Sequence, residues 1–342
     1  MKTEIHALSH KLYIDVQPYL TSYFTPLYDN FNKEIFDSEI GIPNAFEDFV
    51  QLVYNAHKQS FKRIYMKEIF IPIPSYNKDS KDILLGFSAG LDSVYQAIAL
   101  KEQGYNVKLF YLINGNMYEN GQSYKWAKVI AEKLNMSLIT AKISPNTKKD
   151  NPYRKFWAEN PIKNQYIMAM MVDTCIEYNI QYISMGDDFN LDIEHAAIGI
   201  NLTDAKEMTQ TWLKGLHHYL PDMKFIPIEN NIEKDKRIEK LIEYNLQDYY
   251  YSCVQSGRFN QKFHKTCEEK YNIKLFHNNC GTYCRKCAMH NLILYYKGIQ
   301  TFPEDFINKC WERMWNNAHS ADYVFFSPDI PLEQRIKNLL EY

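Results

Sequence analysis

Short β-rich runs alternate with amphipathic helical stretches from about residue 82 to residue 245, and this alternation restricts the possible folds more than any other feature of the chain. The predicted strands cover residues 83–87, 107–113, 137–143, 181–185 and 224–228. Apolar residues recur at helical spacing over residues 92–103, 122–134, 164–179 and 204–218. The pattern predicts an α/β fold with a doubly wound, mostly parallel five-stranded sheet, helices on both faces, and ligands at the carboxyl ends of its strands.

The segments on either side of this alternation differ from it in composition. Residues 1–80 are rich in Tyr, Phe and Pro, contain a helical stretch near 46–61, and include "IFIPIPSYN" (69–77), which we interpret as a strand leading into a turn. We expect them to form an N-terminal appendage that packs on the sheet and adds an edge strand. Residues 249–342 hold a cysteine cluster and then helical patterns, which leaves residues 81–248 as the expected sheet domain.

Composition and charge exclude several classes of protein. Of the 342 residues, 46% are hydrophobic and 23% are charged, as in a folded globular protein. No apolar run approaches the roughly 18 residues that a membrane span needs. The N-terminal "MKTEIHALSHKLYIDV" lacks the apolar core of a signal peptide, so we expect a cytoplasmic protein. A formal net charge of −2 gives no support for broad nucleic-acid binding, although it is compatible with a local basic patch.

The stretch "GFSAGLDSVYQAIAL" (86–100) places small and hydroxyl residues between a predicted strand and a predicted helix. A tight turn through Ser88 and Gly90, followed by a helix opening with Asp92 and Ser93, leaves backbone N–H groups that suit a phosphate. Gly90 permits close backbone approach and a positive φ, and Ala89 is a small residue that is tolerated unless its own position needs a positive φ. Neither the Walker Gly-Lys-Ser/Thr ending nor the three-glycine dinucleotide fingerprint is present. An ordinary helix N-cap is the alternative interpretation.

Five of the seven cysteines lie close together in the sequence. They are Cys253, Cys267, Cys280, Cys284 and Cys287. In a reducing cytosol such clustering indicates a metal site rather than disulfides, although buried cysteines are also common packing residues. The spacing of "CGTYCRKC" (280–287) lets three thiolates face one point, and a fourth ligand would close a tetrahedral zinc site. Our choice for the fourth ligand is Cys253, over Cys267, His264 or His277.

Several motifs carry a resemblance to known enzymes. "SAGLDS" (88–93) resembles the Ser-Gly-Gly-x-Asp-Ser signature of the PP-loop ATP pyrophosphatases, with Ala89 in place of the first glycine. Together with the cysteine cluster, this makes the chain similar to the 7-cyano-7-deazaguanine synthase family over roughly residues 82–298. Residues 160–188 resemble that family's Pro-x-Arg-Asn helix and the strand after it, and residues 232–253 resemble its lysine-containing helix that leads to a cysteine.

Three departures from the family pattern bear on function. Lys163 stands where the family has arginine, so a bidentate contact would become a point charge. The cysteine triplet carries one extra residue between its first two members, and a longer insertion follows Cys253. Residues 1–80 have no counterpart in the short enzymes, but resemble the extension of longer relatives encoded in bacterial anti-phage gene clusters. The substrate can therefore differ from that of the short enzymes.

The resemblance implies a HUP-type (adenine nucleotide α-hydrolase-like) domain that binds ATP and Mg²⁺, and a structural Zn²⁺ site on Cys253, Cys280, Cys284 and Cys287. A carboxylate like that of 7-carboxy-7-deazaguanine would form an acyl adenylate, and ammonia or a protein amine would convert it to an amide or nitrile, with AMP and pyrophosphate released. The residues implied in catalysis are Ser88, Asp92, Ser93, Lys163 and Lys234. Those implied in nucleotide binding are Ser88, Ala89, Gly90, Leu91, Asp92, Ser93, Asn114, Asn164, Gly186 and Asp188.

Plainer interpretations stand beside these assignments. Both lysines could be solvated helix residues, Asn114 could form a turn, and Asn164 and Asp188 could cap helices. A tRNA-modifying PP-loop enzyme would use the same loop, although the near-neutral net charge disfavours it. A non-catalytic nucleotide-binding subunit of a defence complex is the other alternative. We expect no membrane contact and no general nucleic-acid binding, and a homodimer is compatible with the resemblance.

Overall fold

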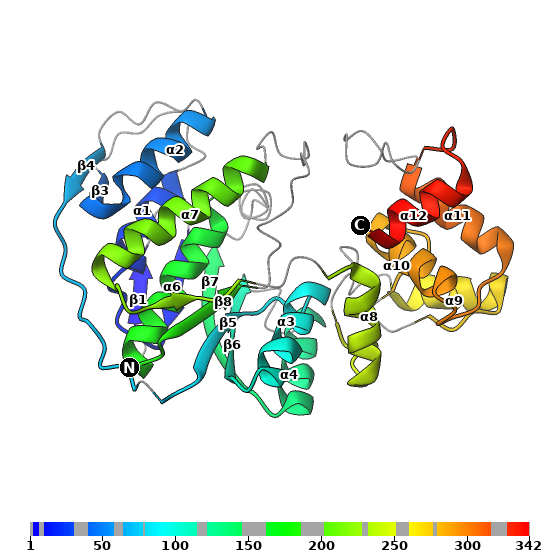
Figure 1. Cartoon of the computed structure of the whole chain (residues 1–342), viewed down its shortest axis with the longest axis horizontal. Helices are drawn as coiled ribbons and strands as arrows, with labels where there is room; N and C mark the ends of the chain where they lie inside the picture. Colours follow the sequence, from blue (N-terminus) through cyan, green and yellow to red (C-terminus); the bar gives the residue numbers. More distant parts are fainter. Residues whose placement is uncertain are drawn as a thin grey trace.

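The structure is a computed structural model. It describes residues 3–6, 10–30, 40–57, 64–77, 79–114, 122–145, 162–185, 202–227, 232–250, 260–275, 279–315 and 327–341. The predicted alternation is present as a mostly parallel seven-stranded sheet with helices on both faces (Figure 1). No helix in these ranges is long and apolar enough to cross a membrane.

Five parallel strands form the centre of the sheet, in the order β7-β6-β5-β8-β9. They are β5 (Asp82–Gly86), β6 (Asn106–Asn114), β7 (Ser137–Pro145), β8 (Tyr182–Met185) and β9 (Lys224–Phe225). The helices that connect them are α3 (Leu91–Glu102), α4 (Gln122–Leu134), α6 (Lys163–Tyr178) and α7 (Leu202–Tyr219). These elements lie close to their predicted positions, except that β9 ends three residues earlier than expected.

The two faces of the sheet bury two separate cores. Along β5, Ile83 and Leu85 pack into the core beneath α3 and α4, whereas Leu84 packs into the core beneath α6 and α7. Successive side chains of a strand point to opposite faces, so a continuous apolar run in β5 is what a strand covered on both sides requires. Each connection crosses in the same hand, and the helices therefore divide between the faces as Figure 1 shows.

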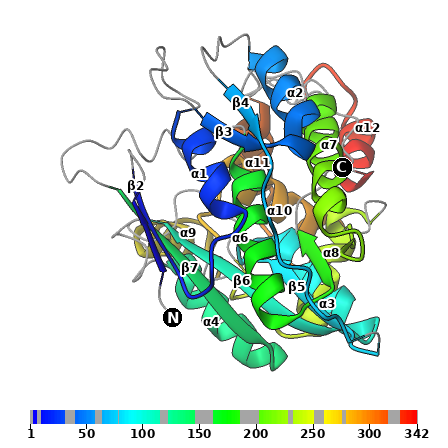
Figure 2. The ribbon, with the colours of Figure 1, turned by 90° about the vertical axis from the view of Figure 1, so that its left-hand side faces the viewer.

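The sheet has two strands more than the predicted five. β1 (Thr3–His6) and β2 (His10–Ile14) form an antiparallel hairpin, and β2 pairs antiparallel with β7 through partners such as Leu12 and Ile143. Figure 2 shows β2 beside β7 at this edge. The alternation that marks β2 spans only a few residues, with Leu12 and Ile14 buried, and is too short to stand out in an aromatic-rich segment.

The predicted strand at residues 69–77 was wrong, since this segment carries no strand. Pro72 and Pro74 have no amide hydrogen to donate to a ladder, which explains why "IFIPIPSYN" stays outside the sheet despite its apolar alternation. Phe70 is 83% exposed and Ile73 is 66% exposed along it. The strand that does form nearby, β4 (Ile64–Lys67), pairs in parallel with β3 (Ile40–Pro43).

The remaining N-terminal elements pack on the face that carries α6 and α7. They are α1 (Thr21–Asn30), the short 3₁₀ helix η1 (Asn44–Phe46) and α2 (Glu47–His57). The ring of Tyr28 on α1 stacks on Tyr166 of α6 at 4.4 Å between centroids, and Phe24 meets Trp212 of α7 at 5.9 Å. Aromatic contacts of this kind add specific geometry to apolar burial, so α1 is held in one orientation.

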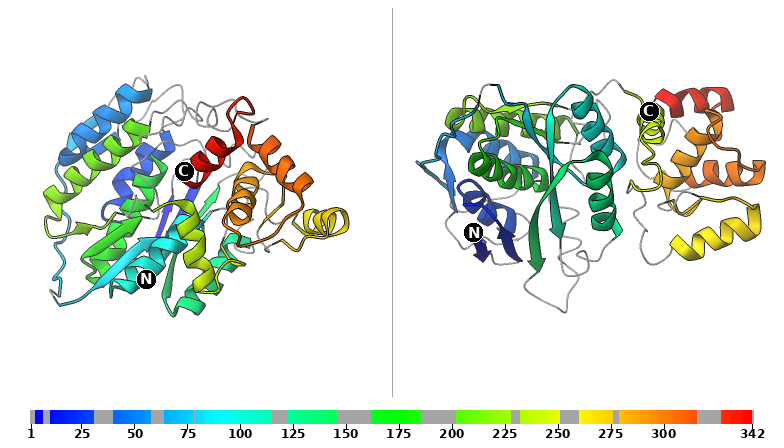
Figure 3. Two further views of the ribbon diagram at one scale, coloured as in Figure 1. Left: turned by 45° about the vertical axis from the view of Figure 1, so that its right-hand side comes forward. Right: turned by 90° about the horizontal axis from the view of Figure 1, so that it is seen from below.

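The C-terminal helices form a group beyond α3. They are α8 (Lys234–Glu243), α9 (Asn260–Tyr271), α10 (Arg285–Tyr296), α11 (Glu304–Trp315) and α12 (Leu332–Glu341). Figures 1 and 3 show α8 standing between α3 and the other four helices. Their buried side chains, including Leu241 of α8 and Phe306 of α11, belong to the same core as α3 and α4.

A buried carboxylate fixes α1 to the sheet domain. Asp173 of α6 is fully buried and accepts hydrogen bonds from the backbone N–H groups of Leu20, at 2.7 Å, and Thr21, at 2.9 Å. These two amides lie at the start of α1, where the helix has no internal acceptors for them. Burial raises the pKa of Asp173 from the ordinary 3.8 to about 7, against the opposing effect of its hydrogen bonds.

Replacing Asp173→Ala should lower the free energy of unfolding by about 1–3 kcal/mol, because two buried amides lose their acceptor. The native chain holds the carboxyl proton more tightly than the unfolded chain, so this group makes stability fall as pH rises from about 4 to about 7. Urea titrations across that range should show this component in the native chain and lose it in Asp173→Asn. An unchanged pH profile in Asp173→Asn would contradict the assignment.

Candidate functional site

The loop after β5 lies where the order of the strands reverses. The chain moves from β5 through α3 and α4 to β6 and β7 on one side of β5, and then returns through α6 and α7 to β8 and β9 on the other side. β5 and β8 are hydrogen-bonded neighbours whose following connections leave toward opposite faces. Open α/β sheets bind ligands in the crevice that this reversal creates. Residues 87–90 therefore occupy the expected ligand-binding position.

Two serines hold this loop in shape. The hydroxyl of Ser93, which is buried, donates to the carbonyl of Gly90 at 3.1 Å and accepts from the backbone N–H of Ser88 at 3.3 Å. The exposed Ser88 hydroxyl lies 3.2 Å from that of Ser93 and accepts from the N–H of Gly90, also at 3.2 Å. Both serines therefore have a structural role: their hydrogen bonds hold the bend that leads from β5 into α3.

The strained position of the turn is Ala89, the residue that replaces the first glycine of the signature, and not Gly90. Ala89 has φ of 59° and is fully buried, whereas Gly90 has φ of −75° and ψ of 165°. The left-handed region costs a residue with a Cβ about 1–2 kcal/mol, so the alanine is tolerated at a cost that the glycine of the PP-loop signature would avoid. Gly90 is the N-cap of α3 and makes no side-chain cap, which leaves the first amides of that helix facing the crevice.

Asp92 is held by an arginine that the sequence did not point out. The Nη1 atom of Arg237, in the first turn of α8, lies 2.6 Å from Oδ1 of Asp92, in the first turn of α3. The Arg237 side chain is 3% exposed, its Nε donates to the carbonyl of Ile232, and its guanidinium lies 5.9 Å from the centre of the Tyr95 ring. This pairing neutralises the anionic charge of Asp92 at the place proposed for phosphate.

Two further residues shape the crevice from beneath. The amide nitrogen of Gln96 on α3 donates to the hydroxyl of Ser184 on β8 at 3.1 Å, so the two sides of the reversal are joined by a buried hydrogen bond. Gly86 ends β5, and a Cβ there would lie 2.4 Å from the sulfur of Met185. The sequence carries both signals: a glycine at the end of the strand before the turn, and a glutamine on the buried face of the helix after it.

Lys163 and Lys234 occupy equivalent places in the topology. Each is the first residue of a helix, α6 and α8, and neither helix has a side-chain cap at its N-terminus. α6 follows β7, so its N-terminus lies at the carboxyl edge of the strands, as does that of α3. α8 reaches the turn through Arg237. Uncapped helix starts attract anions, which gives the two lysines positions consistent with phosphate binding. Both lysines are half-buried.

Other predicted residues are placed only in part. Asn164 is half-buried beside Lys163 in the first turn of α6, and Asn114 is the last residue of β6. Leu91, the first residue of α3, is buried in the core beneath that helix and can offer only its backbone amide. Gly186 and Asp188 lie outside the described residues, as does the whole "GDD" segment after β8. Their proposed contacts with nucleotide stay predictions.

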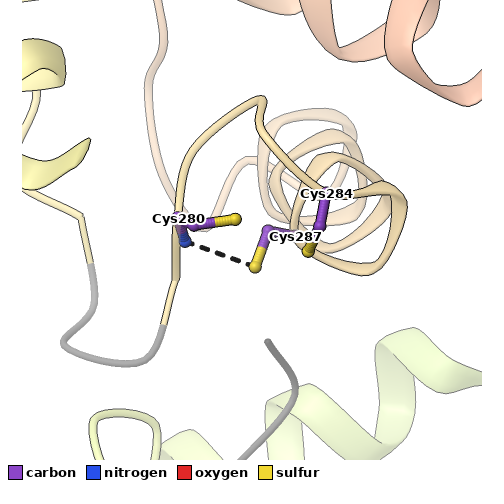
Figure 4. A group of neighbouring side chains, drawn as sticks. All are labelled: Cys280, Cys284 and Cys287. Carbon is purple, nitrogen blue, oxygen red and sulfur yellow. Dashed lines mark hydrogen bonds between the residues drawn. The ribbon is translucent and has the colours of Figure 1, made fainter. Parts of the chain in front are cut away.

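Three predicted metal ligands come together at the start of α10 (Figure 4). The sulfur atoms of Cys280, Cys284 and Cys287 lie within 4.8 Å of one another, all three residues are buried, and none is in a disulfide. Sulfurs bound to one zinc ion are about 3.8 Å apart at the usual Zn–S length, so this arrangement fits the metal. The backbone N–H of Cys280 donates to the sulfur of Cys287 at 3.3 Å, as Figure 4 marks.

A buried amide network fixes the turn that carries Cys280. The side-chain oxygen of Asn279 accepts from the N–H of Gly281 at 2.8 Å, and the side-chain nitrogen of Asn291 donates to the carbonyl of Gly281 at 3.1 Å. The two asparagine side chains also bond to each other. Gly281 has φ of 69°, and a Cβ there would lie 2.7 Å from the sulfur of Cys267. Glycine is therefore required by both backbone conformation and space.

The structure reduces the number of candidates for the fourth ligand of the cysteine cluster. Cys253, our choice, lies outside the described residues, and so does His277. Cys267 and His264 are described, and neither belongs to the cluster of sulfurs. His264 instead contacts the carbonyl of Asn279 through Nε2 at 2.7 Å, and Cys267 packs in the hydrophobic core. Cys253 stays the predicted fourth ligand, because His264 and Cys267 make other contacts.

Helix α8 connects the turn after β5 with the cysteine-bearing helix. Asp235 of α8, completely buried, pairs with Lys297 just beyond α10. Tyr250, shortly after α8, lies 3.0 Å through its hydroxyl from Nδ1 of His290 on α10. Burial lowers the pKa of His290 to about 3, and the positive charge of Lys234 acts in the same direction. The histidine is therefore neutral at physiological pH, and Lys234 lies close enough to affect it.

Comparisons with known proteins add little to this geometry. No protein-family model matches the chain, and no curated protein matches it. Among solved structures, the chain is similar to the U34-tRNA thiolase NcsA from Methanococcus maripaludis with its 4Fe-4S cluster, at 15% sequence identity and a TM-score of 0.33. The alignment covers 55% of this chain and 66% of the thiolase chain. A likeness this weak leaves the α/β fold to be established by the sheet order itself.

Ala89→Val should lower the free energy of unfolding by about 1–3 kcal/mol, because a β-branched residue fits poorly at positive φ. Ala89→Gly should stay within about 1 kcal/mol of the native chain, since relief of backbone strain is offset by the greater freedom of the unfolded chain. Denaturant titration of both variants tests the assignment. Equal stability of the two variants would show that the turn is not strained at this position.

Gly281→Ala should remove most of the bound metal, since its Cβ would meet the Cys267 sulfur and shift the turn that presents Cys280. Gly298→Ala is a matched control: Gly298 has φ of 67°, and a Cβ there would meet nothing within 4 Å. Elemental analysis of both purified variants should find metal loss only at position 281. Equal metal content in the two variants would contradict the assignment.

Proposed function

We propose that the chain is an ATP pyrophosphatase of the PP-loop type that adenylates a small carboxylate and releases pyrophosphate. The observation that carries this proposal is the turn from Ser88 to Ser93 at the strand-order reversal, which opens an uncapped helix toward the crevice. Its sequence differs from the PP-loop signature only at Ala89. The likeness of residues 160–188 and 232–253 to 7-cyano-7-deazaguanine synthase supports 7-carboxy-7-deazaguanine, or a related carboxylate, as the substrate.

The residues of the turn would bind and orient the phosphates of ATP. The first amides of α3 and the exposed hydroxyl of Ser88 would donate hydrogen bonds to phosphate oxygens, while the buried Ser93 would keep the turn in shape. Arg237 neutralises Asp92, so the carboxylate would orient the loop without repelling the phosphates. Mg²⁺, when bound with ATP, would neutralise further phosphate charge, and Asp92 is the carboxylate of this turn that could help to hold it.

The chemistry that fits this arrangement is a displacement at the α-phosphorus. A substrate carboxylate oxygen forms the new bond to phosphorus, the bond to the bridging oxygen breaks, and pyrophosphate leaves. Lys163 and Lys234 would stabilise negative charge on the phosphates through their positions at helix starts. An amine, from ammonia or a protein, then attacks the acyl carbon and displaces AMP, which yields an amide. A second activation of that amide would yield the nitrile.

The cysteine cluster is proposed to be a structural zinc site. Three buried thiols with Cys253 would provide four sulfur ligands, which leaves no open position for a substrate or water. Four thiolates also suit an iron–sulfur cluster, so the two metals must be separated by measurement. Elemental analysis should find zinc, and the purified protein should lack the visible absorption of an iron–sulfur cluster.

The activity is tested by incubating the purified chain with ATP, Mg²⁺, 7-carboxy-7-deazaguanine and ammonia, followed by mass spectrometry. AMP and a deazaguanine amide or nitrile are expected. Asp92→Ala should lower their formation at least about 100-fold, because the turn loses the group that orients it. Asp82→Ala is the matched control, since Asp82 lies at the opposite, amino end of β5 and pairs there with Lys108. It should leave AMP formation near the native rate.

The possible results separate the competing functions. ATP binding without AMP release would favour a non-catalytic nucleotide-binding subunit of a larger complex. AMP release that requires added tRNA, and not the carboxylate, would favour a tRNA-modifying enzyme. AMP formation equal in Asp92→Ala and the native chain would remove the turn from the reaction altogether.

A further inference from the structure

A second cavity lies beside the cysteine cluster, well away in sequence from the turn after β5. It measures about 290 Å³ and is formed by α9, the turn from Cys280 to Tyr283, and α11. Its walls bring together three cations, two tyrosine rings and two threonine hydroxyls: Lys270, Lys309, Arg313, Tyr271, Tyr283, Thr266 and Thr282. None of the described residues lining it is acidic, in a chain with 41 acidic and 39 basic residues.

Among the described residues, neither Lys270 nor Lys309 of this cavity forms an ion pair with a carboxylate, in contrast to Lys265 on the same helix as Lys270. Lys265, earlier on α9, pairs with Glu269 at 3.5 Å, whereas Lys270 lies beside Lys309. Asp305 acts on Lys270 from α11, but it does not line the cavity. Lys270 and Lys309 therefore bring two cationic side chains to one wall of the cavity, where a phosphate would accept hydrogen bonds from both.

Arg313 extends the same arrangement. Its Nε is buried and has no hydrogen-bond partner among the described residues, although buried donors are nearly always satisfied. Its guanidinium lies 5.7 Å from the centre of the Tyr283 ring, and Tyr283 is 47% exposed. The ammonium group of Lys270 lies 5.0 Å from the centre of the Tyr271 ring. Each tyrosine therefore stands beside a cation at the cavity.

We propose that this cavity binds a nucleotide, either free or as one unit of a single strand of nucleic acid. The phosphate would contact Lys270, Lys309 and Arg313, and the base would stack on Tyr283. The volume is near the lower end of the roughly 300–1,000 Å³ of ligand pockets, which favours one nucleotide over a larger ligand. An acidic peptide would satisfy the cations, but only a nucleotide would also place a flat aromatic base on the exposed ring of Tyr283.

The proposal is independent of the chemistry proposed at the strand edge. All residues that line the cavity come after residue 260, and none belongs to the turn or to the helix starts of α3, α6 and α8. Nucleotide binding here can therefore succeed whether or not the chain releases AMP, and each proposal can fail without the other.

The test uses the full chain and a fluorescein-labelled decauridylate, with binding followed by fluorescence anisotropy. The native chain should bind it, more weakly as salt is raised. Lys309→Ala and Arg313→Ala should each weaken binding about tenfold or more, and Tyr283→Ala about fivefold or more. Lys265→Ala is the matched control, because Lys265 is exposed on the same helix α9 and outside the cavity, and it should bind as the native chain does. Circular dichroism and metal content confirm that each variant is folded.

Competition experiments identify the source of the nucleotide. Displacement of the probe by uridine monophosphate supports a free nucleotide, and resistance to it supports a unit of a strand. Displacement by a decaglutamate peptide, with Tyr283→Ala binding as the native chain, would replace the proposal with a simple anion or acidic-peptide site. The absence of probe binding, or equal binding by Lys309→Ala, Arg313→Ala and Lys265→Ala, would overturn it.

Discussion

The single hand of the crossover connections is the constraint on which the rest of the structure depends. Because every parallel connection crosses in the same sense, a chain that builds outward from β5 in one direction and then in the other must place its helices on opposite faces. The two cores and the crevice beyond β5 and β8 both follow from this. The turn from Ser88 to Ser93 is placed to bind a ligand because it lies at this crevice.

Local pattern allowed the central sheet to be predicted, and long-range contacts explain what was missed. The helices and parallel strands between residues 82 and 225 carry strong periodicity, whereas the β1–β2 hairpin depends on pairing with β7, more than 120 residues away in sequence. At the candidate sites, the cysteine triplet could be predicted because its spacing along the sequence is short and local. Arg237 could not be predicted, because nothing in a lysine-rich helix shows that one cation turns inward to meet Asp92.

The turn after β5 shows that the position of backbone strain cannot be assigned from residue type alone. From the sequence, Gly90 permits a positive φ most easily, and whether position 89 needs one stays open. The structure gives the positive φ to Ala89, while Gly90 has an extended conformation that any residue can adopt. Only the path of the chain between the end of β5 and the start of α3 decides which residue of the turn is left-handed, and composition carries no information about that path.

The N-terminal hairpin has a further consequence for the behaviour of the protein at high concentration. Without it, the nine residues of β7 would form an open sheet edge, and long open edges recruit strands from other molecules. With it, the outermost strand on that side among the described residues is β1, which has four residues and a Glu4–Lys11 ion pair, while the outermost described strand on the other side is the two-residue β9. Both of these strands are short and offer few backbone groups for pairing with another molecule. The hairpin therefore covers the long edge of β7 that would otherwise favour aggregation.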